Sequence, residues 1–357
     1  MVKVLVVDDS AFMRNALSNM LASDPEITVI GTARDGLEAI AKVKTMKPDI
    51  VTLDIEMPRM DGIEALKHIM SENPVPVVMV SSLSTEGATV TLKALDMGAV
   101  DFIPKNLHDM SVNILRIKEI LVDKIKLLAR RGVRRIPKSD PLPPEEQLIE
   151  DLFKEPEDRD GGRTIGERKL SLLAIGTSTG GPKALQEILT VFPRTIPVPV
   201  VIAQHMPPNF TGPFAERLNT LTRLTVKEAV DGEPLRQGVV YIAPGGGNMR
   251  VTRNSASEAQ ISVSLTREEY IYCPSVDALM SSCEETYPGR TLAVILTGMG
   301  HDGLEGVRRV KRGGGRVFVQ DESTCVVFGM PKAVVDAGLA DKVLPLNKIA
   351  GEIVNSL

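Results

Sequence analysis

The chain has no tryptophan and only three cysteines in 357 residues. Cys273, Cys283 and Cys325 are widely spaced and form no C-x-x-C pattern, so the sequence indicates neither a disulfide framework nor a zinc site. No apolar run approaches the roughly 20 residues that a membrane helix needs. The opening segment MVKVLVVDDS is too short and too acidic for a signal peptide. We therefore expect a soluble cytoplasmic protein without direct membrane insertion.

An excess of charge of one sign is also missing. The formal net charge is −4, which gives no electrostatic reason to expect nucleic acid or an anionic membrane as partner. No basic recognition helix is evident, and the basic run 130–135 is interpreted as part of a solvated linker. The chain does have 43% hydrophobic and 25% charged residues, which is ordinary globular composition, and its length suits two domains.

Residues 1–128 alternate short β-branched segments with amphipathic ones. The segments that predict strands are 3–7, 28–32, 50–53, 75–80 and 101–103, and those that predict helices are 11–22, 36–44, 62–71, 87–97 and 113–128. Strands that alternate with helices indicate a doubly wound, largely parallel sheet covered on both faces. We assign residues 1–125 to this first α/β domain.

The composition changes after residue 128. The segment 129–168 is rich in charge, proline and glycine and poor in β-branched residues, which is typical of a linker. We assign residues 126–168 to a flexible linker, in which Gln147–Phe153 predicts no more than a transient helix.

Alternating strands and helices return from Leu170 onward. Strands are predicted at 170–175, 198–203, 239–243, 291–297 and 316–320. A further β-rich patch, residues 250–263, contains a hairpin-like turn at Arg253-Asn254-Ser255. We assign residues 169–357 to a second α/β domain, again largely parallel, with a small antiparallel appendage.

Three carboxylates of the first domain follow predicted strands. Asp8 and Asp9 come after the first strand, and Asp54 comes after the third. Because the carboxyl ends of parallel strands lie along one edge of a sheet, we expect these side chains to cluster there. Lys105 and Ser81 follow two further strands and reach the same edge. An oxygen cluster of this kind suits Mg²⁺, and with a lysine and a hydroxyl it fits the transfer of a phosphoryl group to a carboxylate.

Four segments of the first domain, VLVVDDS, DIEMPRMDGIEAL, VVMVSS and GAVDFIPK, resemble the response-regulator receiver family in order and spacing. The resemblance implies a flavodoxin-like fold and a histidine kinase as phosphodonor. It also implies phosphorylation of Asp54, a Mg²⁺ site formed by Asp8, Asp9, Asp54 and the Glu56 backbone carbonyl, the switch residues Ser81 and Phe102, and a phosphate contact from Lys105. The chain departs from the family after the lysine, where proline is usual, since Pro104 precedes Lys105 and Asn106 follows it.

The second domain opens with a strand, a glycine-rich turn and a helix. The segment Gly176–Gly180 matches the G-x-S-x-G elbow, which projects a serine hydroxyl, here Ser178, from a sharp strand-to-helix turn. The helix N-terminus behind it supplies free N–H groups for developing negative charge. Glycine-rich turns also bind phosphate, but the Walker pattern fails because Gly181 is followed by Pro182 and Lys183.

A serine nucleophile needs a base, and this domain contains only two histidines. His205 ends a predicted strand, and His301 lies beside Asp302 after another predicted strand. Either histidine could act with Ser178 and Asp302 in a Ser–His–Asp triad, and the residue chemistry by itself does not choose between them. The chain order, serine then histidine then aspartate, differs from that of the α/β-hydrolases and argues against that superfamily.

The segments AIGTSTGGPKAL, VIAQHMP, VYIAPG, PSVDAL, VILTGMGHDG and VFVQDESTCVVFGMP resemble the catalytic domain of the chemotaxis protein-glutamate methylesterases. The resemblance implies a Rossmann-like three-layer fold with Ser178 as nucleophile, His205 as base, Asp302 as its orienter, the Met299 amide in the oxyanion hole and Thr179 as an assisting residue. It implies hydrolysis of glutamate methyl esters, and deamidation of glutamines, on methyl-accepting chemoreceptors. No cofactor is expected for the hydrolysis. A receiver in front implies regulation by phosphorylation and a chemotaxis histidine kinase as partner.

Two other interpretations remain for the second domain. Gly298–Gly303 matches G-x-G-x-x-G after a strand, and Asp321 follows the next strand, as in a dinucleotide-binding fingerprint. We disfavour this interpretation because the fingerprint usually opens its domain, and because the same glycines allow the tight turn that positions Asp302. The domain could also be a hydrolase-like shell that acts only as a phosphorylation-dependent binding module.

Overall fold

The computed structural model describes residues 1–105, 114–132, 169–265 and 270–357. The chain divides into two compact units, Met1–Arg135 and Ile136–Leu357, each with its own sheet and core. The predicted linker helix at 147–153 lies outside the described residues. Among the helices that are described, none is long and apolar enough to span a bilayer.

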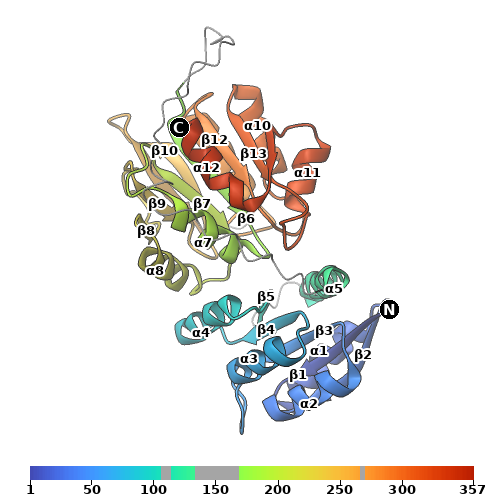
Figure 1. Ribbon diagram of the computed structural model, residues 1–357. Coiled ribbons are helices and arrows are strands. Elements are labelled where there is room, and N and C mark those ends of the chain that lie inside the picture. Colours follow the sequence, from blue (N-terminus) through green and yellow to red (C-terminus); the bar gives the residue numbers. More distant parts are fainter. Residues whose placement is uncertain (106–113, 133–168, 266–269) are drawn as a thin grey trace. The chain divides into compact units, whose positions relative to one another are not determined.

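The first unit contains one five-stranded parallel sheet in the order β2-β1-β3-β4-β5. Its strands are β1 (Val2–Val7), β2 (Ile27–Ala33), β3 (Ile50–Asp54), β4 (Val77–Ser81) and β5 (Asp101–Pro104). Its helices are α1 (Ala11–Ala22), α2 (Gly36–Met46), α3 (Gly62–Glu72), α4 (Thr85–Asp96) and α5 (Ile114–Arg131). Helix α1 packs beside α5, and α2 packs beside α3 (Figure 1). This strand order is the flavodoxin-like one, which confirms the predicted fold class.

Local capping explains where these helices begin. Ser10, Asp35, Asp61 and Ser84 each precede a helix and accept a hydrogen bond from the backbone amide three residues on. The Ser84 cap starts α4 at Thr85, two residues before the predicted start.

Helix α5 continues to Arg131, so it includes residues 126–131, which our sequence assignment placed in the linker. The extra turns are held by contacts that composition does not reveal. Leu128 is buried, Lys126 bonds both Asp24 and Glu26, and Arg130 also bonds Glu26.

The second unit contains a seven-stranded parallel sheet in the order β14-β13-β12-β6-β7-β9-β8. Its strands are β6 (Leu172–Thr177), β7 (Val200–Gln204), β8 (Thr225–Glu228), β9 (Val239–Ile242), β12 (Thr291–Ile295), β13 (Arg316–Gln320) and β14 (Lys342–Leu344). Its helices are α7 (Gly181–Val191), α8 (Thr211–Leu221), α9 (Val276–Thr286), α10 (Leu304–Gly313), α11 (Met330–Asp336) and α12 (Leu346–Ser356). The sequence pattern does not predict β8 and β14, which are short strands of four and three residues.

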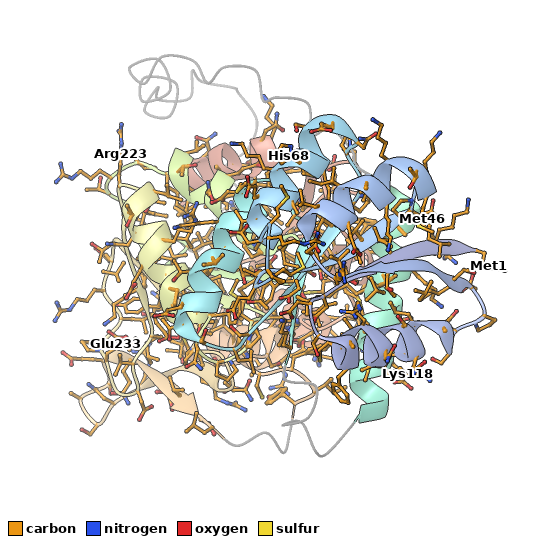
Figure 2. The ribbon with its side chains drawn as sticks, turned by 90° about the horizontal axis from the view of Figure 1, so that it is seen from below. Met1, Met46, His68, Lys118, Arg223 and Glu233 are labelled. Atoms are coloured by element: carbon orange, nitrogen blue, oxygen red, sulfur yellow. The ribbon has the colours of Figure 1, made fainter. Side chains whose placement is uncertain are left out.

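The predicted antiparallel appendage is present as the hairpin β10 (Asn248–Arg253) and β11 (Ala259–Ser264). The side chain of Asn254 builds its turn, because Oδ1 accepts hydrogen bonds from the amides of Ala256 and Glu258, each at 2.9 Å. Apolar side chains fill the space between the sheets and their helices, while charged groups such as Arg223 project outward (Figure 2).

Each sheet has a point where the chain reverses its direction of winding. In the first sheet this point lies between β1 and β3, and in the second between β6 and β12. In open parallel sheets ligands bind outside the carboxyl ends of the strands at such a point. Asp8 follows β1 and Asp54 is the last residue of β3, while Ser178 follows β6 and the loop with Asp302 follows β12.

Candidate active site and carboxylate cluster

The carboxylates of Asp8, Asp9 and Asp54 converge at the carboxyl edge of the first sheet. Each offers an oxygen that lies within 4.8 Å of the others. Lys105 Nζ lies 2.7 Å from Asp54 Oδ2 and 3.7 Å from Asp8 Oδ2. The backbone amide of Glu56 donates to Asp54 Oδ1 at 3.2 Å, so the loop after β3 folds back over this carboxylate.

Burial dominates the electrostatics of this cluster. It raises the pKa of Asp54 to about 6, and the charge of Asp8 adds to the shift, although the hydrogen bond from Lys105 opposes it. Burial also raises the pKa of Asp8, despite a hydrogen bond from the Ser10 amide. Two carboxylates held out of water with one lysine leave a surplus of negative charge.

The residues present fit a divalent cation. Asp8 Oδ2 is buried and, within the described residues, has no hydrogen-bond partner. The available ligand atoms are all oxygens, which is the set that Mg²⁺ prefers. A cavity beside Asp54 is lined by Glu56, Ser81, Ser82, Glu86 and Lys105 among others. Ser82, directly after β4, and Glu86, in the first turn of α4, are not indicated by the pattern of strand ends.

The two expected switch residues are buried and tied to helices of the first unit. Ser81 Oγ accepts a hydrogen bond from Thr91 Oγ1 of α4 at 2.7 Å. The carbonyl of Phe102 accepts one from Lys124 Nζ of α5 at 3.3 Å, and the same Nζ lies 2.7 Å from Asp101. The sequence gives no local sign of these helix partners, since they are ten and 22 positions away.

In the second unit His205 and Asp302 are paired. His205 Nε2 lies 2.8 Å from Asp302 Oδ2, and both side chains are nearly buried. His301 next to Asp302 is exposed. Of the two histidines that the sequence left open, the fold therefore places His205 against the carboxylate.

Asp302 also caps the N-terminus of α9. It accepts hydrogen bonds from the amides of Val276 and Asp277 and from Ser275 Oγ, at 2.8 to 3.1 Å. Burial by itself would raise the pKa of Asp302, but the bond from His205 and these amides outweigh it, and the pKa is lowered. Asp302 is therefore held as an anion beside the imidazole.

Asp277 is a second carboxyl group at this position. Burial raises its pKa to about 6, against a hydrogen bond from the Gly306 amide, and the charge of neighbouring Asp302 raises it further. Neither Asp277 nor Ser275 was singled out in our sequence analysis, although both lie in the segment PSVDAL.

Ser178 follows β6 at the turn into α7. Its amide donates to the Thr297 carbonyl at 3.0 Å, which ties it to the loop after β12. Gly180 takes a φ of 80°, a left-handed conformation that favours glycine. A Cβ on Gly298 would lie 2.9 Å from Ser178 Cβ, so the loop that carries Met299 passes directly beside the serine. Thr179 is buried, and its carbonyl accepts a hydrogen bond from Thr297 Oγ1 at 2.9 Å.

The imidazole of His205 is enclosed by an aromatic ring that sequence reasoning missed. Tyr272 stacks on it with a centroid separation of 4.4 Å and an interplanar angle of 10°. His205 Nδ1 is buried and has no hydrogen-bond partner within the described residues. Nδ1 is therefore the ring nitrogen that remains free to take up a proton.

The glycine-rich segment 298–303 is occupied by contacts within the fold. The Gly298 amide donates to Val327, and the Gly298 carbonyl accepts from Gly329 and Met330. Asp321 accepts hydrogen bonds from Ser323 Oγ and from both the amide and the hydroxyl of Thr324. The contacts of Asp321 are thus those of a local turn, which weakens the dinucleotide interpretation.

Comparisons with known proteins agree with this geometry. Residues 4–114 match the response regulator receiver domain, and residues 173–353 match the CheB methylesterase family. A protein-glutamate methylesterase/protein-glutamine glutaminase of Oleidesulfovibrio alaskensis is 49% identical over 100% of both chains. Its namesake in Halalkalibacterium halodurans is 46% identical over 99% of this chain and 97% of its own.

A solved structure also resembles the second unit. The CheB methylesterase catalytic domain of Thermotoga maritima is 42% identical, covers 53% of this chain and 100% of its own, and superposes with a TM-score of 0.51. The sequence similarity to the full-length relatives covers both domains. The chain therefore belongs to the CheB family of protein-glutamate methylesterases/protein-glutamine glutaminases, with an N-terminal receiver domain.

Proposed function

We propose that this chain hydrolyses glutamate methyl esters on methyl-accepting chemoreceptors and that phosphorylation of its receiver regulates the reaction. The observation that carries the proposal is the pairing of His205 with Asp302 at the sheet edge where Ser178 is displayed. Relatives named protein-glutamate methylesterase/protein-glutamine glutaminase, which match this chain over 99% or more of its length, support the esterase part of the proposal.

In the proposed mechanism Ser178 Oγ attacks the ester carbonyl carbon while His205 takes up the hydroxyl proton. Asp302 accepts a hydrogen bond from the Nε2–H group of His205, so the proton stays on Nε2 and Nδ1 is the nitrogen that takes up the serine proton. The imidazolium then returns the proton to the departing methoxide, and methanol leaves. Water then attacks the acyl-enzyme while His205 takes up one of its protons. His205 returns this proton to Ser178 Oγ as the acyl bond breaks, which releases glutamate and free Ser178.

The tetrahedral intermediate carries a negative charge on the former carbonyl oxygen. We propose that the Met299 amide stabilises it, because its loop lies against Ser178 through Gly298 and because no hydrogen bond within the described residues engages that amide. Thr179, next to the nucleophile, is proposed as an assisting residue. A primary amide has the same carbonyl geometry, so receptor glutamines would be deamidated by the same steps with ammonia as leaving group.

For the receiver we propose Asp54 as the phosphoacceptor, with a chemotaxis histidine kinase as phosphodonor. Asp8, Asp9, Asp54 and the Glu56 carbonyl would hold Mg²⁺, which when bound neutralises phosphoryl oxygens. Lys105, whose Nζ lies 2.7 Å from Asp54 Oδ2, would contact a phosphoryl group on Asp54, and Ser81 lines the same cavity. Phe102 and Ser81 would respond to phosphorylation through their links to α5 and α4.

The test is methanol release from methylated receptor by the full-length protein, with and without a small-molecule phosphodonor. We expect release that rises with the phosphodonor, and no rise in an Asp54→Asn variant. A serine-hydrolase probe that labels wild type but not Ser178→Ala would exclude a binding module without catalysis. Release by Ser178→Ala at the wild-type rate would refute the proposed nucleophile.

A further inference from the structure

Gln204 is the last residue of β7 and directly precedes His205. Its side chain is 2% exposed. Both hydrogens of its amide group are used, because Nε2 donates to the carbonyl of Ser178 at 2.9 Å and to the carbonyl of His205 at 3.1 Å. One buried amide therefore contacts the backbone of both residues that we propose as nucleophile and base.

This amide acts where the regular sheet ends. The ladder between β6 and β7 finishes at the pair Thr177 and Gln204, followed by one bond from the His205 amide to the Thr177 carbonyl at 3.1 Å. Beyond that point the two strands turn away into α7 and into the loop after β7. Beyond the backbone ladder, the Gln204 side chain bonds the carbonyls of both Ser178 and His205.

Gly181 makes room for this arrangement. A Cβ at this position would lie 2.0 Å from Gln204 Oε1 and 2.4 Å from Thr177 Oγ1, distances that no real side chain tolerates. The packing of Gln204 and Thr177 therefore explains why glycine stands at position 181, the second glycine of the segment S-T-G-G-P.

The other half of the amide is left unsatisfied. Gln204 Oε1 is buried and has no hydrogen-bond partner within the described residues. A buried acceptor without a partner is destabilising. The contacts that the amide makes are therefore those of its donor half, to the carbonyls of Ser178 and His205.

We propose that Gln204 is a positioning residue of the esterase, whose amide holds the backbones of Ser178 and His205 at the separation that proton transfer requires. The inference rests on the proposed function of those two residues. Displacement of a reacting group by about 1 Å can lower a rate by roughly 100-fold, so loss of the two donors should lower turnover without weakening receptor binding.

The experiment compares the kinetics of the full-length Gln204→Met variant with those of wild type on methylated receptor. The methionine side chain has a length similar to that of glutamine but no hydrogen-bond donor. We expect kcat to fall by roughly 10- to 100-fold with KM within about twofold, and the rate at which a fluorophosphonate probe labels Ser178 to fall in parallel. Thr286→Val is the matched control, because it removes another buried side-chain bond, 2.7 Å to the Val251 carbonyl, at the far end of α9. This control should keep wild-type kcat and labelling.

A folded Gln204→Met variant with wild-type kcat and labelling rate would overturn the inference, and so would equal losses in the Thr286→Val control. If Gln204→Met does not fold, Gln204→Asn retains the amide but is too short to reach both carbonyls, and it should show the same fall in kcat at constant KM. Ser178→Ala is measured in the same series. If it stays active, the proposed function fails. If it is inactive while the Gln204 variants are unaffected, only the positioning role fails.

Discussion

His205 Nε2 lies 2.8 Å from Asp302 Oδ2, although the two residues are 97 positions apart in the chain. The carboxylate is oriented independently of the histidine, because the N-terminal amides of α9 also bond it. The imidazole that we propose as the base is therefore oriented through Asp302 by the N-terminus of α9, and on its face by the Tyr272 ring.

The two histidines of the catalytic domain offer a matched pair of substitutions. We expect His205→Ala to lower kcat on methylated receptor by roughly 10⁴- to 10⁶-fold, on the scale of triad residues in serine hydrolases. His301→Ala should stay within about twofold of wild type, because that side chain is exposed and unpaired with Asp302. Methanol release at saturating receptor checks both. The opposite ranking would transfer the role of base to His301.

Tyr272 should matter through its ring, because the ring stacks on the imidazole of His205. Stacked aromatic pairs contribute about 0.5–1.5 kcal/mol, which corresponds to roughly a two- to tenfold effect on a rate that depends on the imidazole orientation. We expect Tyr272→Leu to lower kcat in that range and Tyr272→Phe to retain it. Steady-state kinetics with both variants checks this expectation. A larger loss in Tyr272→Phe than in Tyr272→Leu would indicate that the hydroxyl is the functional group.

Mg²⁺ binding to the receiver should weaken as the solution is acidified. The pKa of Asp54 is raised to about 6, so the carboxylate is ionised above that pH and protonated below it. Protons then compete with the cation, and we expect affinity to fall up to about tenfold per pH unit below pH 6. Isothermal titration of the full-length protein between pH 5 and pH 8 measures this. In Asp54→Asn the affinity should be lower at pH 8 and should depend less on pH, and an unchanged pH dependence would contradict the assignment.

Asp277 should make the second domain less stable as the pH rises. Its folded-state pKa of about 6 lies above the ordinary value of 3.8, so the folded state binds more protons between these values. The stability associated with the protonated form is fully present below about pH 4 and is lost as the pH rises through 6. We expect Asp277→Asn to raise the urea midpoint at pH 7.5 relative to wild type, with little change at pH 4.

Asp321 supplies a control of opposite sign. Its hydrogen bonds from Thr324 and Ser323 outweigh burial and lower its pKa, so its contribution is lost as the pH falls. Asp321→Asn should therefore destabilise the protein most at pH 7.5. If both variants shift the midpoint in the same direction at that pH, the assignment for Asp277 is wrong.

Much of the fold was predictable because its signals are local. The alternation of β-branched and amphipathic segments predicted five strands in the receiver and five in the catalytic sheet, together with the hairpin. It missed β8 and β14, which are only four and three residues long, and each of which has at most one buried residue. It also ended the last receiver helix too early, because the contacts of Lys126 and Arg130 come from residues about 100 positions away.

The sequence by itself determined which side chains stand at strand ends, and the parallel-sheet rule then brought Asp8, Asp9, Asp54 and Lys105 together. The cluster could be predicted from the identity and position of these residues, because the end of a strand is a local property of the sequence. Only the tertiary structure decided that His205 and not His301 faces Asp302, that Tyr272 covers the imidazole and that Gln204 joins Ser178 to His205. Those contacts depend on how the loops after β7, β11 and β12 meet in space, and no periodicity along the chain encodes such a meeting.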